Sequence, residues 1–270
     1  MSKSIGKGAP DRIVTPPPRI VRTARGPIEC SLSGEGATLL ALHGGIGGHD
    51  QSRLLARSLL DAHNDHRIVA VSRPGYLRTP LDAGRTPEEQ ADAYAALLDA
   101  LGISTATVAA VSAGGPSAIQ FAHRHPAKCR ALVLVSACSA KLDASAKIMS
   151  RLRAMQALAL VPGMGAFLRW RANARPNEAA ARAISGPAVR ARTLSHASAG
   201  VLFRALQLSV FCRMRERLPG TINDMAVFAN LDPCLINPIV QPTLIVHGTA
   251  DTVVSFSHAK ADRRSAFDPN

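Results

Sequence analysis

The sequence predicts a doubly wound α/β fold, in which a mostly parallel sheet carries helices on both faces and a helical cap is inserted before a late strand. Two observations lead to this prediction. Between residues 38 and 136, short apolar runs alternate with segments of helical periodicity, as is typical of parallel sheets. Residues 141–235 then show helical patterning without strand signals, before an apolar run returns at residues 242–246.

The strands are expected in apolar runs bounded by turn residues. The first two flank Gly26 and Pro27 and are expected to form an antiparallel pair. The later runs are almost continuously apolar, as in parallel strands that are buried on both faces. The expected strands are residues 19–23, 28–32, 38–42, 67–71, 105–111, 130–136 and 242–246.

The helices of the core are expected between these strands. One of them has a clear start signal, with Thr86 as N-cap, Pro87 at the first helical position and Glu89 placed to complete a capping box. Gly102 is suited to end the same helix. The expected core helices are residues 51–63, 87–101 and 114–125.

Composition and patterning divide the chain into four segments. Residues 1–18 are rich in glycine and proline and are expected to form a flexible arm. Residues 19–140 are the first part of the α/β core, residues 141–235 the helical insertion, and residues 236–270 the second part of the core. Prolines and glycines predict helix breaks within the insertion at residues 162–163, 176, 186–187 and 219–220.

Hydrophobic residues make up 47% of the chain, which is enough for a core and excludes a disordered protein. Five cysteines lie scattered without CxxC spacing, which favours a reducing compartment over disulfides or a zinc site. No apolar run reaches the length of about 20 residues that spans a bilayer, and none has the form of a signal peptide. We therefore expect a cytoplasmic protein without a membrane span.

The net charge of +13 is concentrated in the insertion, where residues 141–240 hold 14 basic and 5 acidic side chains. Such a surface attracts nucleic acid, anionic lipid or an acidic substrate. With two tyrosines and one tryptophan, the chain has no aromatic platform on which bases could stack. We interpret the charge as a solvated surface and expect no nucleic acid partner. Docking to nucleic acid or an anionic membrane stays open as an alternative, with steep salt dependence as its signature.

Ser112 stands where the predicted strand 105–111 passes directly into a helix. A serine at such a turn is held in a strained backbone conformation with its hydroxyl exposed, which suits a nucleophile. The small neighbours Ala110, Ala113 and Gly114 fit a place where strand and helix pass closely. The alternative is an ordinary serine that caps the helix.

A glycine-rich loop follows the predicted strand 38–42 and begins with His43 and Gly44. Such a loop can turn backbone N–H groups toward a developing oxyanion, with Gly45 or Ile46 as one donor and Ala113 as the other. The alternatives are a simple tight turn or a phosphate cradle, although no Gly-Lys-Ser/Thr follows as in a P-loop. We interpret His43 itself as a structural residue.

Asp251 follows the predicted strand 242–246 and should emerge at the same sheet edge as Ser112. A carboxylate in that place can orient an imidazole, fix its tautomer and stabilise the imidazolium. The alternative is a loop aspartate that caps a helix starting near Val254.

These three motifs, together with the loop at residues 73–80, resemble the α/β-hydrolase superfamily over residues 19–262. Ala110 stands where the G-x-S-x-G pattern of the family has its first glycine. The resemblance implies that Ser112 is the nucleophile and Asp251 the triad acid. It also implies that Gly45, Ile46 and Ala113 form the oxyanion hole, and that residues 141–235 form a lid.

The sequence departs from this family at the catalytic histidine. Family members continue through one more helix, an edge strand and a Gly-His that carries the base, whereas no strand pattern follows Ala261 here. We therefore expect the last strand to be lacking, as after a frameshift or early stop, and residues 243–246 to form an unpaired apolar edge. His196 and His258 are the candidates for a substitute base.

The function implied by the resemblance is ester hydrolysis through an acyl-enzyme on Ser112, without a metal or organic cofactor. The apolar stretch at residues 158–168 favours a small-molecule substrate with an apolar acyl or alkyl group. The alternative is a non-catalytic protein of the same fold that binds a small molecule without turnover.

Overall fold

The computed structural model describes residues 16–60, 65–142, 146–184, 186–231 and 239–260. Most of the expected N-terminal arm, residues 1–15, lies outside these ranges. So do the end of the helix expected at residues 51–63 and the last ten residues of the chain.

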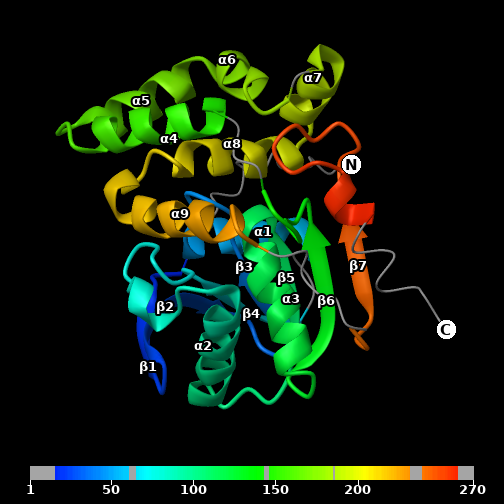
Figure 1. The fold of residues 1–270 in the computed structure, drawn as a ribbon. Coiled ribbons are helices and arrows are strands. Elements are labelled where there is room, and N and C mark those ends of the chain that lie inside the picture. Colours follow the sequence, from blue (N-terminus) through cyan, green and yellow to red (C-terminus); the bar gives the residue numbers. More distant parts are fainter. Residues whose placement is uncertain (1–15, 61–64, 143–145, 185, 232–238, 261–270) are drawn as a thin grey trace, which may run out of the picture.

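A mostly parallel sheet forms the centre of the molecule (Figure 1). In the described part of the chain it has seven strands in the order β1-β2-β4-β3-β5-β6-β7. β1 pairs with β2 in antiparallel fashion and the pairs among β3 to β7 are parallel, as the sequence predicts. β2 also pairs with β4 in antiparallel fashion, which the sequence does not predict. The strands are β1 (Arg19–Thr23), β2 (Gly26–Ser33), β3 (Ala37–Leu42), β4 (His66–Val71), β5 (Ala106–Val111), β6 (Cys129–Val135) and β7 (Thr243–Val246).

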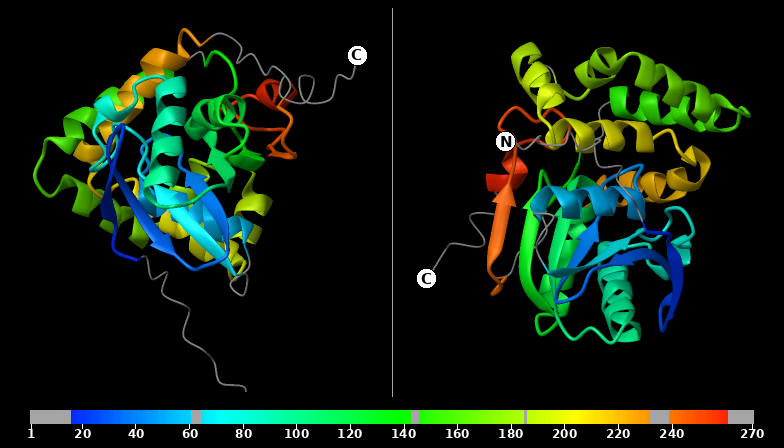
Figure 2. Two further views of the ribbon diagram at one scale, coloured as in Figure 1. Left: turned by 90° about the horizontal axis from the view of Figure 1, so that it is seen from below. Right: turned by 180° about the vertical axis from the view of Figure 1, so that it is seen from behind.

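Core helices cover both faces of this sheet, α2 and α3 on one side and α1 on the other (Figures 1 and 2). Side chains of a strand alternate between the two faces. Leu40 and Leu42 therefore join the core under α2 and α3, whereas Leu39 and Ala41 pack toward α1. These helices are α1 (His49–Leu59), α2 (Pro87–Ala100) and α3 (Gly115–Arg124).

The capping box predicted for α2 is confirmed. The Thr86 hydroxyl accepts a hydrogen bond of 3.3 Å from the Glu89 N–H, and the Glu89 carboxylate accepts one of 3.1 Å from the Thr86 N–H. Both groups belong to the backbone donors that a helix start otherwise leaves unpaired.

A second layer of helices lies over the carboxyl ends of the strands, between β6 and β7 in the chain (Figure 1). The breaks expected at residues 162–163, 176 and 186–187 fall where α5, α6 and α7 begin. The helices of this layer are α4 (Ala146–Ala159), α5 (Met164–Ala174), α6 (Pro176–Ala181), α7 (Pro187–Ser195), α8 (Ala199–Ser209) and α9 (Met214–Phe228).

The fourth expected break is wrong, because α9 continues through Pro219 and Gly220. The loop after β4 supplies the bonds that the helix loses there: the Gly220 N–H donates to the Gly75 carbonyl at 2.8 Å, and the Glu216 carbonyl accepts from Leu77 at 2.7 Å. A side chain at position 220 would stand 2.2 Å from the ring of Tyr76. The glycine thus permits close packing of α9 on this loop instead of ending the helix.

β7 lies at the edge of the sheet, and among the described strands it pairs with β6 alone. Two of its apolar side chains, Leu244 and Val246, are 55% and 48% exposed. An apolar edge was expected here. Within the described ranges, no helix combines the length and apolar character needed to cross a membrane.

Candidate active site

Ser112 occupies the turn between β5 and α3 with a backbone φ of +52°. Residues with a side chain rarely adopt this left-handed conformation, which costs about 1–2 kcal/mol. No side-chain hydrogen bond caps the short turn Ser112–Gly114 or α3, so the capping interpretation of Ser112 does not hold. Backbone strain of this kind clusters at functional sites, and no capping bond of Ser112 accounts for it here.

The backbones around Ser112 approach one another so closely that glycine is required. A Cβ at Gly115 would stand 2.4 Å from the Cys138 carbonyl oxygen after β6. One at Gly114 would stand 2.8 Å from the His43 carbonyl oxygen after β3. A Cβ at Gly44 would lie 3.1 Å from the Cβ of Ser112. The carboxyl ends of β3, β5 and β6 therefore meet at the serine.

The three expected oxyanion donors are not equivalent. The Ile46 N–H donates to the Thr221 hydroxyl on α9 at 2.9 Å, so it is engaged within the protein. The N–H groups of Gly45 and Ala113 donate to no acceptor in the described part of the chain. The geometry thus leaves Gly45 and Ala113 as the pair available to an oxyanion.

His43 is a structural residue, as expected. Its Nδ1 lies 2.6 Å from the Gly44 carbonyl oxygen, and its Nε2 accepts a hydrogen bond of 3.0 Å from the Arg73 N–H. Burial, and secondly the charge of Arg73, hold the pKa of His43 well below its ordinary value. The neutral ring, with a proton on Nδ1, joins the glycine loop to the loop after β4.

Asp251 follows β7 but binds within its own loop. Its Oδ1 accepts hydrogen bonds from the N–H groups of Val253 and Val254, at 2.8 and 3.0 Å. Its Oδ2 lies 3.9 Å from Nε2 of His247, beyond hydrogen-bond distance, and that nitrogen lies 2.9 Å from the Val254 carbonyl oxygen. These contacts close a local turn, and no helix starts near Val254, because the next helical residues begin at Ser257. In this arrangement Asp251 orients no imidazole among the described residues.

Neither candidate for a substitute base contacts Ser112. His258 is buried, and its Nδ1 accepts a hydrogen bond of 3.2 Å from the Ser139 N–H. His196 is exposed, and its Nδ1 accepts from the N–H groups of Ser198 and Ala199 at the start of α8. Over the described ranges, the Ser112 hydroxyl has no hydrogen-bond partner, and no group of three or more His, Cys, Asp or Glu side chains could hold a metal ion.

The structure has a buried ionic cluster beside the site that the sequence analysis did not predict. Arg73 and Asp224 form an ion pair at 1% and 2% side-chain exposure, and the Tyr76 hydroxyl donates to the same carboxylate at 2.5 Å. Burial raises the pKa of Asp224, while the charge of Arg73 opposes that shift. The cluster fastens α9 to the loop after β4. No local pattern marks it, because 151 residues separate Arg73 from Asp224.

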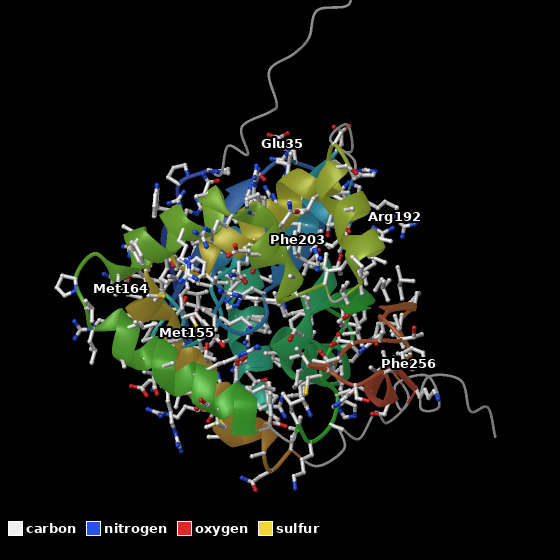
Figure 3. All side chains as sticks on the ribbon, turned by 90° about the horizontal axis from the view of Figure 1, so that it is seen from above. Glu35, Met155, Met164, Arg192, Phe203 and Phe256 are labelled. Carbon is white, nitrogen blue, oxygen red and sulfur yellow. The ribbon has the colours of Figure 1, made fainter. Side chains whose placement is uncertain are left out.

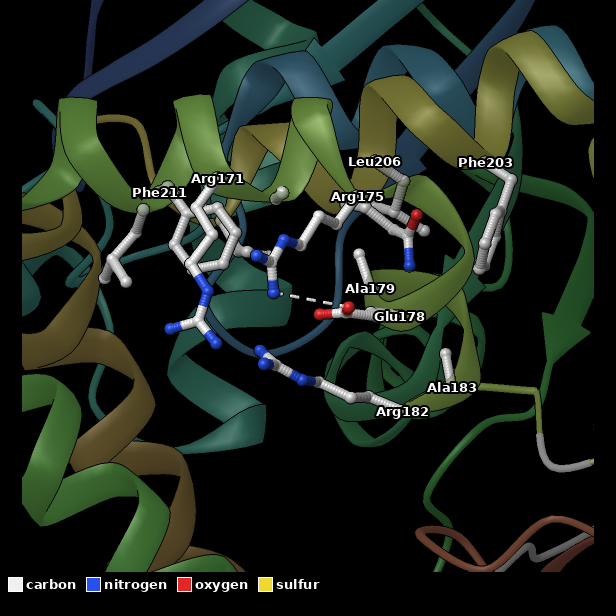
Figure 4. Close-up of a pocket in the computed structure, with 13 residues that line it drawn as sticks. Arg171, Arg175, Glu178, Ala179, Arg182, Ala183, Phe203, Leu206 and Phe211 are labelled. Atoms are coloured by element: carbon white, nitrogen blue, oxygen red, sulfur yellow. Dashed lines mark hydrogen bonds and ion pairs between the residues drawn. The ribbon is translucent and has the colours of Figure 1, made fainter.

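Three cavities lie among the helices above the sheet, with volumes of about 300, 820 and 350 Å³. Ser112 lines none of these three. The first, between α5, α6 and α8, has an apolar lining and several arginines at its mouth (Figure 4).

Comparison with known proteins gives consistent results. Residues 37–265 match the family model of the alpha/beta hydrolase fold. An α/β-hydrolase fold protein from Nakamurella multipartita is similar at 33% identity and a TM-score of 0.76, with 93% of this chain and 86% of that chain covered.

Two further proteins show more limited similarity. An uncharacterized hydrolase of Bacillus subtilis is 37% identical over 112 residues, which are 42% of this chain and 38% of the relative's length. A thermophilic esterase from Thermogutta terrifontis has 19% identity and a TM-score of 0.64, with 92% of this chain and 86% of that chain covered. At that identity the likeness to the esterase concerns the fold alone.

Proposed function

The chain belongs to the alpha/beta hydrolase fold family, and on that premise we propose that it is a serine hydrolase of carboxylic esters with Ser112 as nucleophile. The observation that carries the proposal is the φ of +52° at Ser112, in a turn where three strands end. Unrelated reactions run on this fold, so the proposal rests on the site rather than on the fold.

In the proposed reaction, Oγ of Ser112 forms a bond to the carbonyl carbon of the ester, and the π electron pair moves to the oxygen. The N–H groups of Gly45 and Ala113 stabilise that oxyanion. Collapse of the intermediate breaks the bond to the alcohol oxygen. The alcohol leaves with the proton that Ser112 has given up, and the acyl group stays on Ser112. Water then attacks the acyl carbon, releases the carboxylic acid and returns the proton to the serine.

The proposed reaction requires an acceptor for the serine proton. No described histidine lies within hydrogen-bond distance of Ser112, and a serine without a base is a weak nucleophile at neutral pH. We propose Asp251 as the acid that would orient such a base, because β5 and β7 are parallel and end at the same edge. Slow turnover is expected, since binding and an oxyanion hole can supply about 10³–10⁴-fold catalysis without a complete triad.

We propose further that the helices between β6 and β7 act as a lid for a substrate with an apolar acyl or alkyl group. Leu160 and Phe167 are 69% and 51% exposed, so packing between helices leaves much of these apolar side chains accessible. This exposure supports the proposed contact with an apolar substrate group. The cytoplasm stays the proposed compartment, on the grounds of the scattered cysteines.

The decisive experiment is labelling with a fluorophosphonate probe, alongside hydrolysis of p-nitrophenyl butyrate. The wild-type protein should be labelled slowly, and Ser112→Ala should lose both labelling and hydrolysis while keeping its circular dichroism spectrum. Labelling that persists in Ser112→Ala would refute the assignment of the nucleophile.

One observation favours the second candidate, a non-catalytic binding protein. The Ser112 hydroxyl has no base among the described residues, and Asp251 is engaged by Val253 and Val254. If the folded wild-type protein is not labelled but binds an ester substrate analogue, this second function replaces the first.

A further inference from the structure

The cavity between α5, α6 and α8 has two chemically different parts. Its apolar part includes Phe203, Leu206 and Phe211. Its mouth carries the arginines 171, 175 and 182 with one carboxylate, Glu178. Figure 4 shows the three guanidinium groups gathered around that carboxylate, with Phe203 and Phe211 on either side.

The charges at the mouth are not balanced within the protein. Arg175 lies 3.4 Å from Glu178, and because their side chains are 62% and 58% exposed, this pair contributes little to stability. Arg171 and Arg182 have no ion-pair partner in the described part of the chain. Three like charges around one carboxylate repel one another, so the mouth keeps an excess of positive charge that an anion would relieve.

The surroundings reinforce this charge. From residue 146 to residue 215, the sequence has twelve basic residues and one acidic residue, Glu178. The field of these helices therefore concentrates anions at the surface that contains the cavity. Guanidinium groups bind carboxylates with two parallel hydrogen bonds, a geometry that a solvated lysine does not offer.

We propose that this cavity is a binding site for an amphiphilic organic anion, such as a medium-chain carboxylate, separate from Ser112. The head group pairs with Arg171 and Arg182, and the apolar chain lies against Phe203, Leu206 and Phe211. The volume of about 300 Å³ is at the small end of the range of small-molecule sites, about 300–1,000 Å³. A carboxylate with one chain fits that size better than a lipid with two.

Isothermal titration calorimetry with decanoate below its micelle concentration tests the proposal. The cavity variant is Arg171→Ala/Arg182→Ala. The matched control is Arg151→Ala/Arg192→Ala, which removes the same charge from exposed positions that do not line the cavity. Arg192 lies toward the outer margin of the helical layer (Figure 3). All four arginines are exposed, so both variants should fold.

The wild-type protein should bind one decanoate, and the cavity variant should bind it at least about tenfold more weakly, because charge-assisted hydrogen bonds are lost. The control should stay within about twofold of the wild type. Decanol and acetate should each bind at least about tenfold more weakly than decanoate, since each lacks one half of the ligand.

The proposal is overturned if decanoate does not bind, if decanol or acetate binds as well, or if the control loses as much affinity as the cavity variant. The last result would assign the binding to the general field of the helices. Because no turnover is measured, these outcomes are independent of whether Ser112 acts as a nucleophile.

Discussion

The backbone N–H of Ile46 donates a hydrogen bond of 2.9 Å to the hydroxyl of Thr221, and this bond joins the glycine loop after β3 to α9. The same hydroxyl donates to the Arg217 carbonyl at 3.0 Å, so its one proton is used and a lone pair faces Ile46. Helix α9 thereby fixes the loop in which Gly45, the proposed oxyanion donor, lies.

Replacement of Thr221 by valine should weaken both the fold and the site. Valine has nearly the same shape but leaves the Ile46 N–H without its acceptor, at a cost of about 1–3 kcal/mol in the free energy of unfolding. Thr221→Ser keeps the acceptor and should restore most of the loss. Urea denaturation and the fluorophosphonate labelling rate measure the two effects, and equal behaviour of the two variants would contradict the role given to the hydroxyl.

Asp224→Asn should be among the most destabilising conservative changes in this chain. It leaves the buried guanidinium of Arg73 without a counter-charge, which costs about 3–5 kcal/mol. The matched control is Glu216→Gln in the Arg213–Glu216 pair, where both side chains are at least 40% exposed and the loss should be below about 1 kcal/mol. Thermal or urea denaturation measures the loss of unfolding free energy. A similar loss in both variants would show that burial does not decide how much an ion pair contributes to stability.

Ser112→Gly should be more stable than Ser112→Ala by about 0.5–1 kcal/mol, because glycine adopts a φ of +52° without strain. Ser117, inside α3, is the matched control. At Ser117 the order should reverse, since glycine costs about 1 kcal/mol relative to alanine in a helix. If the alanine variant is more stable than the glycine variant at both positions, the turn at Ser112 is not strained.

Gly115→Ala should destabilise the protein by about 1–3 kcal/mol, because the new methyl group would stand 2.4 Å from the Cys138 carbonyl oxygen. Gly248→Ala is the control, since nothing lies within 4 Å of a Cβ there, and its effect should stay within about 0.5 kcal/mol. Urea denaturation compares the two. A neutral effect at position 115 would show that the strand ends around Ser112 are not tightly packed.

Stability should fall with pH below about 6.5 in part through His43, whose pKa burial holds well below its ordinary value. In this range the unfolded chain binds a proton that the folded protein excludes. The free energy of unfolding therefore decreases by up to about 1.4 kcal/mol for each pH unit.

The pH slope of His43→Gln, measured by denaturation between pH 5 and 7, should be smaller by that amount. An unchanged slope in His43→Gln would show that His43 is protonated in the folded protein.

Local patterns predicted the elements well where the cause was local. The capping box at Thr86 and Glu89 depends on residues three positions apart, and the structure forms it. The same reasoning failed at Pro219 and Gly220. A Pro-Gly pair usually ends a helix, and this expectation ignores segments that pack against the helix from elsewhere in the chain. The loop at Gly75 and Leu77 supplies the missing backbone partners, and no signal in α9 itself reveals that loop.

By itself, the sequence determined the order of strands and helices, the parallel core and the strained turn at Ser112. Each of these follows from periodicity, glycine and proline within a few neighbouring residues. Tertiary structure alone decided that Ile46 is bound by Thr221, that Asp224 neutralises Arg73, and that three arginines meet at one cavity. The first two pairs are separated by 175 and 151 residues, and such contacts are set by how helices pack across the sheet edge rather than by any local preference.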